Sequence, residues 1–211
     1  ITITTNNGEV FAIKDGKKID EKDLGKRSSF VSNINGDVAL LAVTQNAEDK
    51  NAPKELYYIQ DNNMTKLVND AKGCRLSADG NAALYMSGAS ALSKIDFKRD
   101  KTTYIADQVG DYEISPNGEV AAYTIPGYGC TSVYIFDGKE SSLVGDTFPA
   151  NSTILGLSDK GNYIYIKGNS DNEAGPLYCY TRKDNEYVKL CDNFLYLICF
   201  NYNNTQILYT Q

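Results

Sequence analysis

Two carboxylates, Asp111 and Glu113, stand two residues apart near the middle of the chain. A glycosidase uses such a pair, one as the acid and the other as the base or nucleophile. The chain contains no histidine, which removes the commonest general base, most zinc chemistry and every Ser-His or Cys-His nucleophile. Hydrolysis of a glycan by Asp111 and Glu113 is therefore the enzymatic alternative that the composition leaves open.

An aromatic residue on a glycine-flanked tip is the second candidate for chemistry. Tyr128 lies in the segment Pro126-Gly127-Tyr128-Gly129-Cys130, and an exposed tyrosine can stack on a sugar or fill a pocket of a partner protein. Oxygen-bearing residues alternate at Asn169, Asp171 and Glu173, but the glycine and distal glutamate of a complete calcium loop are missing. With no P-loop and no GxGxxG before a helix, we expect no metal and no cofactor.

Charge and hydropathy exclude two classes of partner. The 211 residues carry a net charge of −6, and no stretch concentrates lysine or arginine as a nucleic-acid groove requires. The longest apolar runs, such as Val38 to Val43, are far shorter than the roughly 18 residues of a membrane span. A hydrophobic content of 42% instead predicts one globular domain over residues 1–211.

A polar turn followed by a mostly apolar strand recurs five times along the chain. The clearest copies begin at Ser77-Ala78-Asp79-Gly80 and Ser115-Pro116-Asn117-Gly118. Asp-Gly, Asn-Gly and Asn-Asn tolerate the positive φ angles of tight hairpins. The mean spacing of 42 residues is that of a four-stranded propeller blade. The five residues that end these turns, called the anchors below, are Gly36, Gly80, Gly118, Gly161 and Asn204.

A second hairpin is expected between successive anchors, so that each repeat supplies four strands. The predicted turns of these hairpins lie at 15–16, 61–63, 99–100, 137–138 and 183–184. The chain begins with such a second hairpin, at Phe11 to Ile19, and ends with an anchor hairpin, at Leu195 to Thr210. We therefore expect an all-β fold: a β-propeller of five four-stranded blades, the last blade closed by both termini. The alternating segment Ile1 to Thr5 has no place in that ring.

The repeated Ser-x-Asp/Asn-Gly turn before an apolar strand resembles the WD40-like, TolB-type β-propeller repeat. Ser115-Pro116-Asn117-Gly118 and Ser77-Ala78-Asp79-Gly80 match it best, Ser158-Asp159-Lys160-Gly161 matches in part, and the copies at Gly36 and Asn204 depart from it. The resemblance covers nearly the whole chain and is specific for architecture rather than for function. It implies an extracytoplasmic address, at the cell surface or in the periplasm, on a lipoprotein or behind a membrane anchor.

Aligning the repeats predicts which side chains approach the central channel. The positions five residues before the anchors include Arg75 and Glu113, which would then form a salt bridge between adjacent blades or grip a polar ligand. Tyr112 and Asp111 precede Glu113 on the same strand. Because the candidate acids fall in one blade rather than across the axis, the alignment argues against glycoside hydrolysis. The ligand-binding candidates are Arg75, Asp111, Tyr112, Glu113 and Tyr128.

The function predicted from these features is non-catalytic. We expect a binding domain that presents the loops of one face to a protein or glycan ligand, because propellers bind through loops on rigid blades. The alternatives are a glycan-active hydrolase and a regulatory propeller for a partner domain. The start at Ile1 suggests a trimmed piece of a longer protein. Of the five widely spaced cysteines, Cys179 and Cys199 lie in apolar strand-like runs and are expected to be buried thiols. One disulfide through Cys130 or Cys191 is left open.

Overall fold

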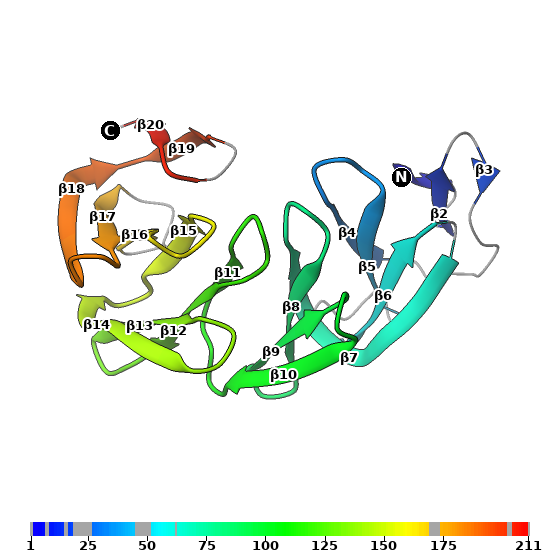
Figure 1. Cartoon of the computed structure of the whole chain (residues 1–211), viewed down its shortest axis with the longest axis horizontal. Coiled ribbons are helices and arrows are strands. Elements are labelled where there is room, and N and C mark those ends of the chain that lie inside the picture. The colour runs from blue at the N-terminus through cyan, green and yellow to red at the C-terminus, as the bar shows by residue number, and fades with distance from the viewer. Residues whose placement is uncertain are drawn as a thin grey trace. The chain divides into compact units, whose positions relative to one another are not determined.

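A computed structural model describes most of the chain, in two compact units formed by residues 1–102 and 103–211. Every regular element in the described part is a β-strand (Figure 1). No helix in that part has the length and hydrophobicity needed to span a bilayer. The described residues are 2–6, 9–14, 17–18, 27–44, 52–61, 63–168, 174–201 and 204–210.

The first unit contains a three-stranded sheet and most of a seven-stranded sheet, both antiparallel. In the small sheet, the middle strand β2 pairs with β1 and β3. The large sheet follows chain order from β4 to β10, and β10 contains the boundary between the units. The strands are β1 (Thr2–Asn6), β2 (Glu9–Lys14), β3 (Lys17–Lys18), β4 (Arg27–Ser32), β5 (Val38–Thr44), β6 (Lys54–Gln60), β7 (Asn63–Leu76), β8 (Ala82–Ser87), β9 (Ala91–Asp96) and β10 (Lys101–Ala106).

The second unit contains two four-stranded antiparallel meanders and a final hairpin. The first meander comprises β11 (Tyr112–Ile114), β12 (Ala121–Pro126), β13 (Cys130–Phe136) and β14 (Ser141–Pro149). The second comprises β15 (Thr153–Leu157), β16 (Tyr163–Lys167), β17 (Gly175–Thr181) and β18 (Glu186–Phe194), and the hairpin pairs β19 (Tyr196–Phe200) with β20 (Ile207–Thr210).

All five anchors adopt the left-handed conformation that the repeat predicts. Their φ angles lie between +55° and +75°, a region that glycine and asparagine enter most easily. Each anchor N–H donates to the carbonyl three residues earlier, at 2.8–3.1 Å. The residue whose carbonyl accepts that bond makes a second one: its side-chain oxygen accepts the backbone N–H of the residue five positions later, at 2.9–3.2 Å. These residues are Asn33, Ser77, Ser115, Ser158 and Asn201.

The side chains of these turns explain why the sequence repeats. In the second repeat, Ser77 Oγ donates to Asp79 at 2.6 Å, and the backbone and side-chain amides of Asn81 also donate to Asp79. Burial raises the pKa of Asp79, but these hydrogen bonds outweigh it and leave the pKa below its ordinary value. Ser115 and Asn117 repeat the arrangement at 2.9 Å. In these two turns a serine hydroxyl and a short polar acceptor two residues later close the turn together, whereas Asn33 and Asn201 take the place of the serine in the first and last turns.

The second hairpins also form. The predicted turn at 15–16 lies outside the described residues, and the other four have a residue with positive φ at or beside the predicted position. Asp61, Asp100 and Gly138 lie at the predicted positions, and Asn185 follows one residue after the predicted Lys183-Asp184 turn. Not every pair of repeats is separated by a loop: the segment 69–73, between the second hairpin of one repeat and the anchor hairpin of the next, belongs to the 14-residue strand β7. A register shift between Ala71 and Gly73 lets this strand continue from one repeat into the next.

Successive repeats share a buried core within each unit. In the first unit, Leu40 and Leu56 share one with Leu76 and Ala83, which lie further along the same seven-stranded sheet. In the second, Ala122 and Phe148 share one with Leu157 and other residues of the β15–β18 sheet. In the second unit the core therefore lies between two sheets, which agrees with the blades predicted from the 42-residue period.

The segment that the predicted ring could not place is a strand. β1 pairs with β2 along its whole length, from Thr2 opposite Ile13 to Asn6 opposite Glu9. Because β2 also pairs with β3, both edges of the strand expected to meet the last hairpin are already used. The count of five blades, closure by the termini and a single domain over residues 1–211 stay predictions.

Candidate functional site

The loop between β10 and β11 is attached to the end of β12 by three backbone-centred hydrogen bonds. Gly110 donates to the carbonyl of Thr124 at 2.9 Å, and Thr124 donates to the carbonyl of Asp111 at 2.9 Å. The backbone N–H of Asp111 in turn donates to Thr124 Oγ1 at 2.9 Å. A Cβ on Gly110 would lie 2.9 Å from Pro126. The two loops, 107–111 and 126–130, therefore lie at one end of the β11–β14 sheet, called the loop face below.

Asp111 connects the loop face to the next sheet. Its Oδ2 accepts the backbone N–H of Ile154, the second residue of β15, at 2.7 Å. Ile154 is buried. A buried backbone N–H without an acceptor would cost free energy, and the Asp111 carboxylate supplies that acceptor. The side chain proposed as a catalytic or ligand-binding acid is thus engaged in joining two repeats.

Tyr112 and Glu113 lie on β11, beside β12. Tyr112 is buried and faces Tyr123 in the register, while Glu113 lies opposite Ala122. Glu113 is half-buried, and its Oε1 accepts the backbone N–H of Ile114 at 3.1 Å. Asp111 directly precedes β11, and Tyr112 and Glu113 lie on it. Tyr112 is part of the core rather than of an accessible surface.

Tyr128 is fully exposed at the tip of the β12–β13 hairpin. The hairpin is closed below it, because Pro126 pairs with Thr131 and Gly127 donates to the carbonyl of Cys130 at 2.8 Å. Gly129 has a φ of +73° and open space around its Cβ position. An aromatic ring is thus presented to solvent on a short, hydrogen-bonded turn.

Arg75 belongs to the other unit. It is exposed on β7, opposite Leu84, and its guanidinium donates to the carbonyl of Cys74 at 3.3 Å. The structure therefore brings Asp111, Glu113 and Tyr128 into one sheet and leaves Arg75 in a different one. The salt bridge between Arg75 and Glu113 stays a prediction.

Several other predictions can be compared with the structure. All five cysteines carry free thiols; Cys179 is buried as expected, but Cys199 is exposed. Burial raises the pKa of Cys74 and of Cys179. The alternating residues Asn169, Asp171 and Glu173 lie outside the described part of the chain. Within that part, no group of three or more histidine, cysteine or acidic residues could bind a metal ion.

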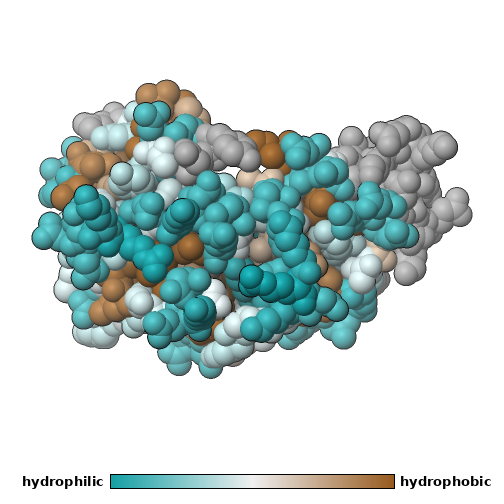
Figure 2. Space-filling view, viewed as in Figure 1, coloured by the Kyte–Doolittle hydropathy of each residue, from teal (hydrophilic) through white to brown (hydrophobic). Residues whose placement is uncertain are grey.

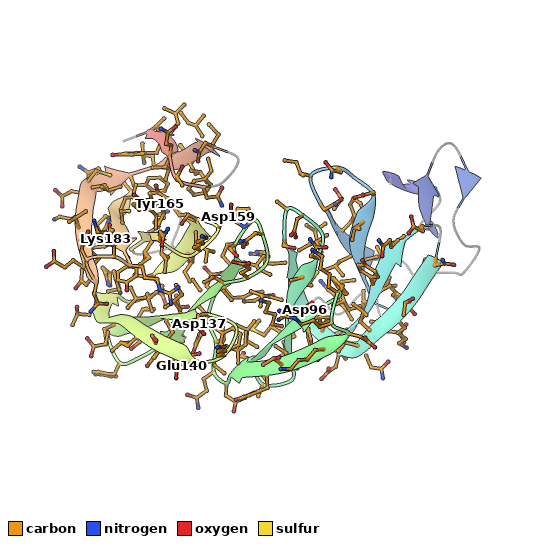
Figure 3. All side chains as sticks on the ribbon, viewed as in Figure 1. Asp96, Asp137, Glu140, Asp159, Tyr165 and Lys183 are labelled. Carbon is orange, nitrogen blue, oxygen red and sulfur yellow. The ribbon has the colours of Figure 1, made fainter. Side chains whose placement is uncertain are left out.

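Sequence reasoning missed the hydrogen bonds that connect neighbouring anchor turns. Asp159, labelled in Figure 3, accepts the backbone N–H of Asn117 at 3.0 Å. In the same way Asn204 donates to the carbonyl of Leu157. Asn117 and Asp159 are 42 residues apart, equal to the mean period. That coincidence is the signal that could have identified them as neighbours on adjacent repeats.

The comparisons with known proteins find likeness in structure but not in sequence. No family model matches the chain, and no curated protein matches it. TolB from Acinetobacter baumannii superposes on 90% of this chain and 50% of its own, with a TM-score of 0.57 and 15% identity. An acylaminoacyl peptidase from Pyrococcus horikoshii superposes on 83% of this chain and 34% of its own, with a TM-score of 0.59 and 15% identity.

A structure of a nidogen–laminin complex also matches, with a TM-score of 0.56 and 7% identity over 99% of this chain and 84% of the other. This chain spans half or less of the TolB and peptidase chains. At such low identities these likenesses concern the fold. The antiparallel sheets, the anchor turns and the superpositions confirm the resemblance in the sequence: the chain has a β-propeller fold of the TolB type.

Proposed function

We propose that this chain is a non-catalytic interaction domain that binds a protein ligand at its loop face. The fully exposed Tyr128 supports this most directly. Large aromatic residues on short, ordered turns bury much apolar area at little entropic cost when a partner binds. Likeness to a chain of a protein–protein complex agrees with a protein partner.

The alternative of a glycan-active hydrolase has less support. A glycosidase acid or base must be able to reach the substrate and exchange a proton with it. Asp111 instead accepts the backbone N–H of Ile154, and Glu113 accepts that of Ile114. Both carboxylates thereby contribute to the sheet end on which Tyr128 is mounted.

The experiment selects ligands without assuming their identity. A library of phage-displayed peptides is selected on the immobilised full chain, and bound clones are compared on the Tyr128→Ala and Tyr196→Ala variants. Tyr196 is the matched control, because it is an exposed tyrosine on β19, outside the two loops. We expect selected peptides to bind Tyr128→Ala at least roughly tenfold more weakly, since the ring is expected to be an anchor of the interface, and Tyr196→Ala as tightly as the parent.

Equal binding to both variants would contradict the loop face as the binding surface. Binding of soluble glycans that depends on Tyr128, with no peptide selected, would replace the protein ligand with a sugar. The two outcomes are distinguished by whether binding depends on Tyr128, which the same pair of variants measures in both cases.

A second candidate is a regulatory domain attached to a catalytic one. The likeness to an acylaminoacyl peptidase, of which this chain covers 34%, favours it. For both candidates we propose an extracytoplasmic address on an anchored protein. Its support is the TolB-type resemblance, and fractionation of cells that express the full gene product tests it.

A further inference from the structure

Asparagine precedes the anchor glycine in two of the anchor turns. The pairs are Asn35-Gly36 in the first repeat and Asn117-Gly118 in the third. Such an asparagine can react with its own backbone, because glycine has no side chain to hinder the approach of its nitrogen to the side-chain carbonyl carbon. The reaction needs no enzyme, so the fold decides which pair is protected. A further pair, Asn7-Gly8, lies outside the described residues.

The backbone has the same conformation at both glycines. Gly36 and Gly118 each have a φ of +71°. The N–H of Gly36 donates to the carbonyl of Asn33 at 3.1 Å, and that of Gly118 donates to the carbonyl of Ser115 at 2.9 Å. Because the attacking nitrogen is held alike in both turns, a difference in reactivity is expected to come from the asparagine side chains.

The side chain of Asn117 is held in place by the turn. Its Oδ1 accepts the hydroxyl of Ser115 at 2.9 Å and the backbone N–H of Glu119 at 3.1 Å. The backbone N–H of Asn117 also donates to Asp159 of the next repeat at 3.0 Å. To bring its carbonyl carbon to the nitrogen of Gly118, the side chain has to rotate and give up both bonds to Oδ1.

The side chain of Asn35 has no such restraint. It is exposed and forms no hydrogen bond with the described residues. The residue two positions earlier is Asn33 rather than a serine, and Asn33 Nδ2 donates to Asp37 at 2.6 Å. The connection to the next repeat is made by Ile34, whose N–H donates to the carbonyl of Ala78 at 3.0 Å. Figure 2 shows mainly hydrophilic residues at the surface where Figure 1 places the turn from β4 to β5.

We propose that Asn35 is a site of spontaneous deamidation, at which the first anchor turn is covalently modified while the third is protected. The backbone nitrogen of Gly36 attacks Cγ of Asn35, and the bond from Cγ to Nδ2 breaks. Nδ2 leaves as ammonia and carries away the proton of the attacking nitrogen. Water then opens the succinimide at either carbonyl, which gives an aspartyl or an isoaspartyl residue. This site goes beyond the proposed loop-face function and uses none of its residues.

The two products have different effects on the turn. The isoaspartyl product places one more carbon in the main chain before Gly36. Two bonds to Asn33 close the turn at present, from the N–H of Gly36 and from that of Val38, at 3.1 and 3.2 Å. The turn has to rearrange to keep both with a longer main chain. The aspartyl product retains the main chain and adds only a charge at an exposed position.

The experiment follows both pairs in the same molecule. The full chain is incubated in mildly alkaline buffer, and its peptides are analysed at intervals by mass spectrometry, which detects the replacement of an amide by an acid. Methylation by an isoaspartyl methyltransferase detects the isoaspartyl product. We expect Asn35 to be converted at least roughly tenfold faster than Asn117, since Asn117 must first lose two hydrogen bonds. In urea, where both turns are unfolded, the two rates should become similar.

Ser115→Ala tests the protecting bond directly. It removes the hydroxyl donor to Asn117 Oδ1 and should accelerate the conversion of Asn117, with circular dichroism showing that the variant is folded. Ser77→Ala is the matched control, because it removes the equivalent hydroxyl from the anchor turn of the second repeat. It should leave the rate at Asn117 unchanged.

Three results overturn the proposal. The first is equal conversion of Asn35 and Asn117 in the folded chain, since the hydrogen bonds then give no protection. The second is a difference that persists in urea, which would assign it to the local sequence rather than to the fold. The third is conversion of Asn35 in urea but not in the folded chain, because the first turn would then be protected as well.

Discussion

Replacing Gly161 with alanine is expected to lower the free energy of unfolding by about 3 kcal/mol, combining left-handed strain with overpacking of a core. The φ of Gly161 is +63°. An added Cβ would lie 2.5 Å from Ile135 Cδ1 and 3.0 Å from Val120 Cγ1. Ile135 and Val120 belong to the buried core of the second unit, so neither can move without disturbing that core. Urea denaturation followed by circular dichroism gives the measurement.

Gly129→Ala separates the two causes. Gly129 has a φ of +73° but no atom within 4 Å of its Cβ position, so its replacement should cost only the conformational strain of about 1 kcal/mol. The difference between the two variants then measures the contact between repeats. If both lose the same stability, the anchor turn of β15–β16 does not pack on the preceding sheet as described.

Replacing Asp111 with alanine is expected to lower the free energy of unfolding by about 2 kcal/mol, because a buried backbone donor loses its charged acceptor. That donor is the N–H of Ile154, 2.7 Å from Asp111 Oδ2. Asp111→Asn keeps an oxygen at the same place and should lose less than half as much. The same denaturation experiment measures both variants.

A ligand-binding or catalytic role predicts the opposite pattern. A carboxylate retained for chemistry is commonly unfavourable for stability, so its removal leaves stability unchanged or raises it. Unchanged or increased stability in Asp111→Ala would therefore contradict its role as a connection between repeats. Similar losses in the alanine and asparagine variants would show that the hydrogen bond to Ile154 needs the negative charge.

The repeated turns could be predicted because each depends on few local residues. Gly118 needs a left-handed φ, and Ser115 and Asn117 make the short hydrogen bonds that close the turn. Such requirements remain visible in one sequence at a fixed period. The packing of the β11–β14 sheet on the β15–β18 sheet could be predicted from the same pattern, because the apolar residues of their strands recur at the same period as the turns.

Other features depend on contacts between repeats, which a single sequence does not display. Asp111 looked like a candidate for chemistry because its partner, the backbone N–H of Ile154, is 43 residues away and carries no signature in the side chain. The continuation of β7 through Ala71 and Gly73 depends on a register shift rather than on a turn residue.

The central claim is that the carboxylates of the β11 end maintain the structure and perform no chemistry. The most direct test is hydrolysis of a panel of polysaccharides by the parent chain and by Glu113→Gln, compared at equal concentration after both are shown to be folded. The account predicts that neither releases reducing ends above the level of the buffer. Release by the parent that is lost in Glu113→Gln would contradict it.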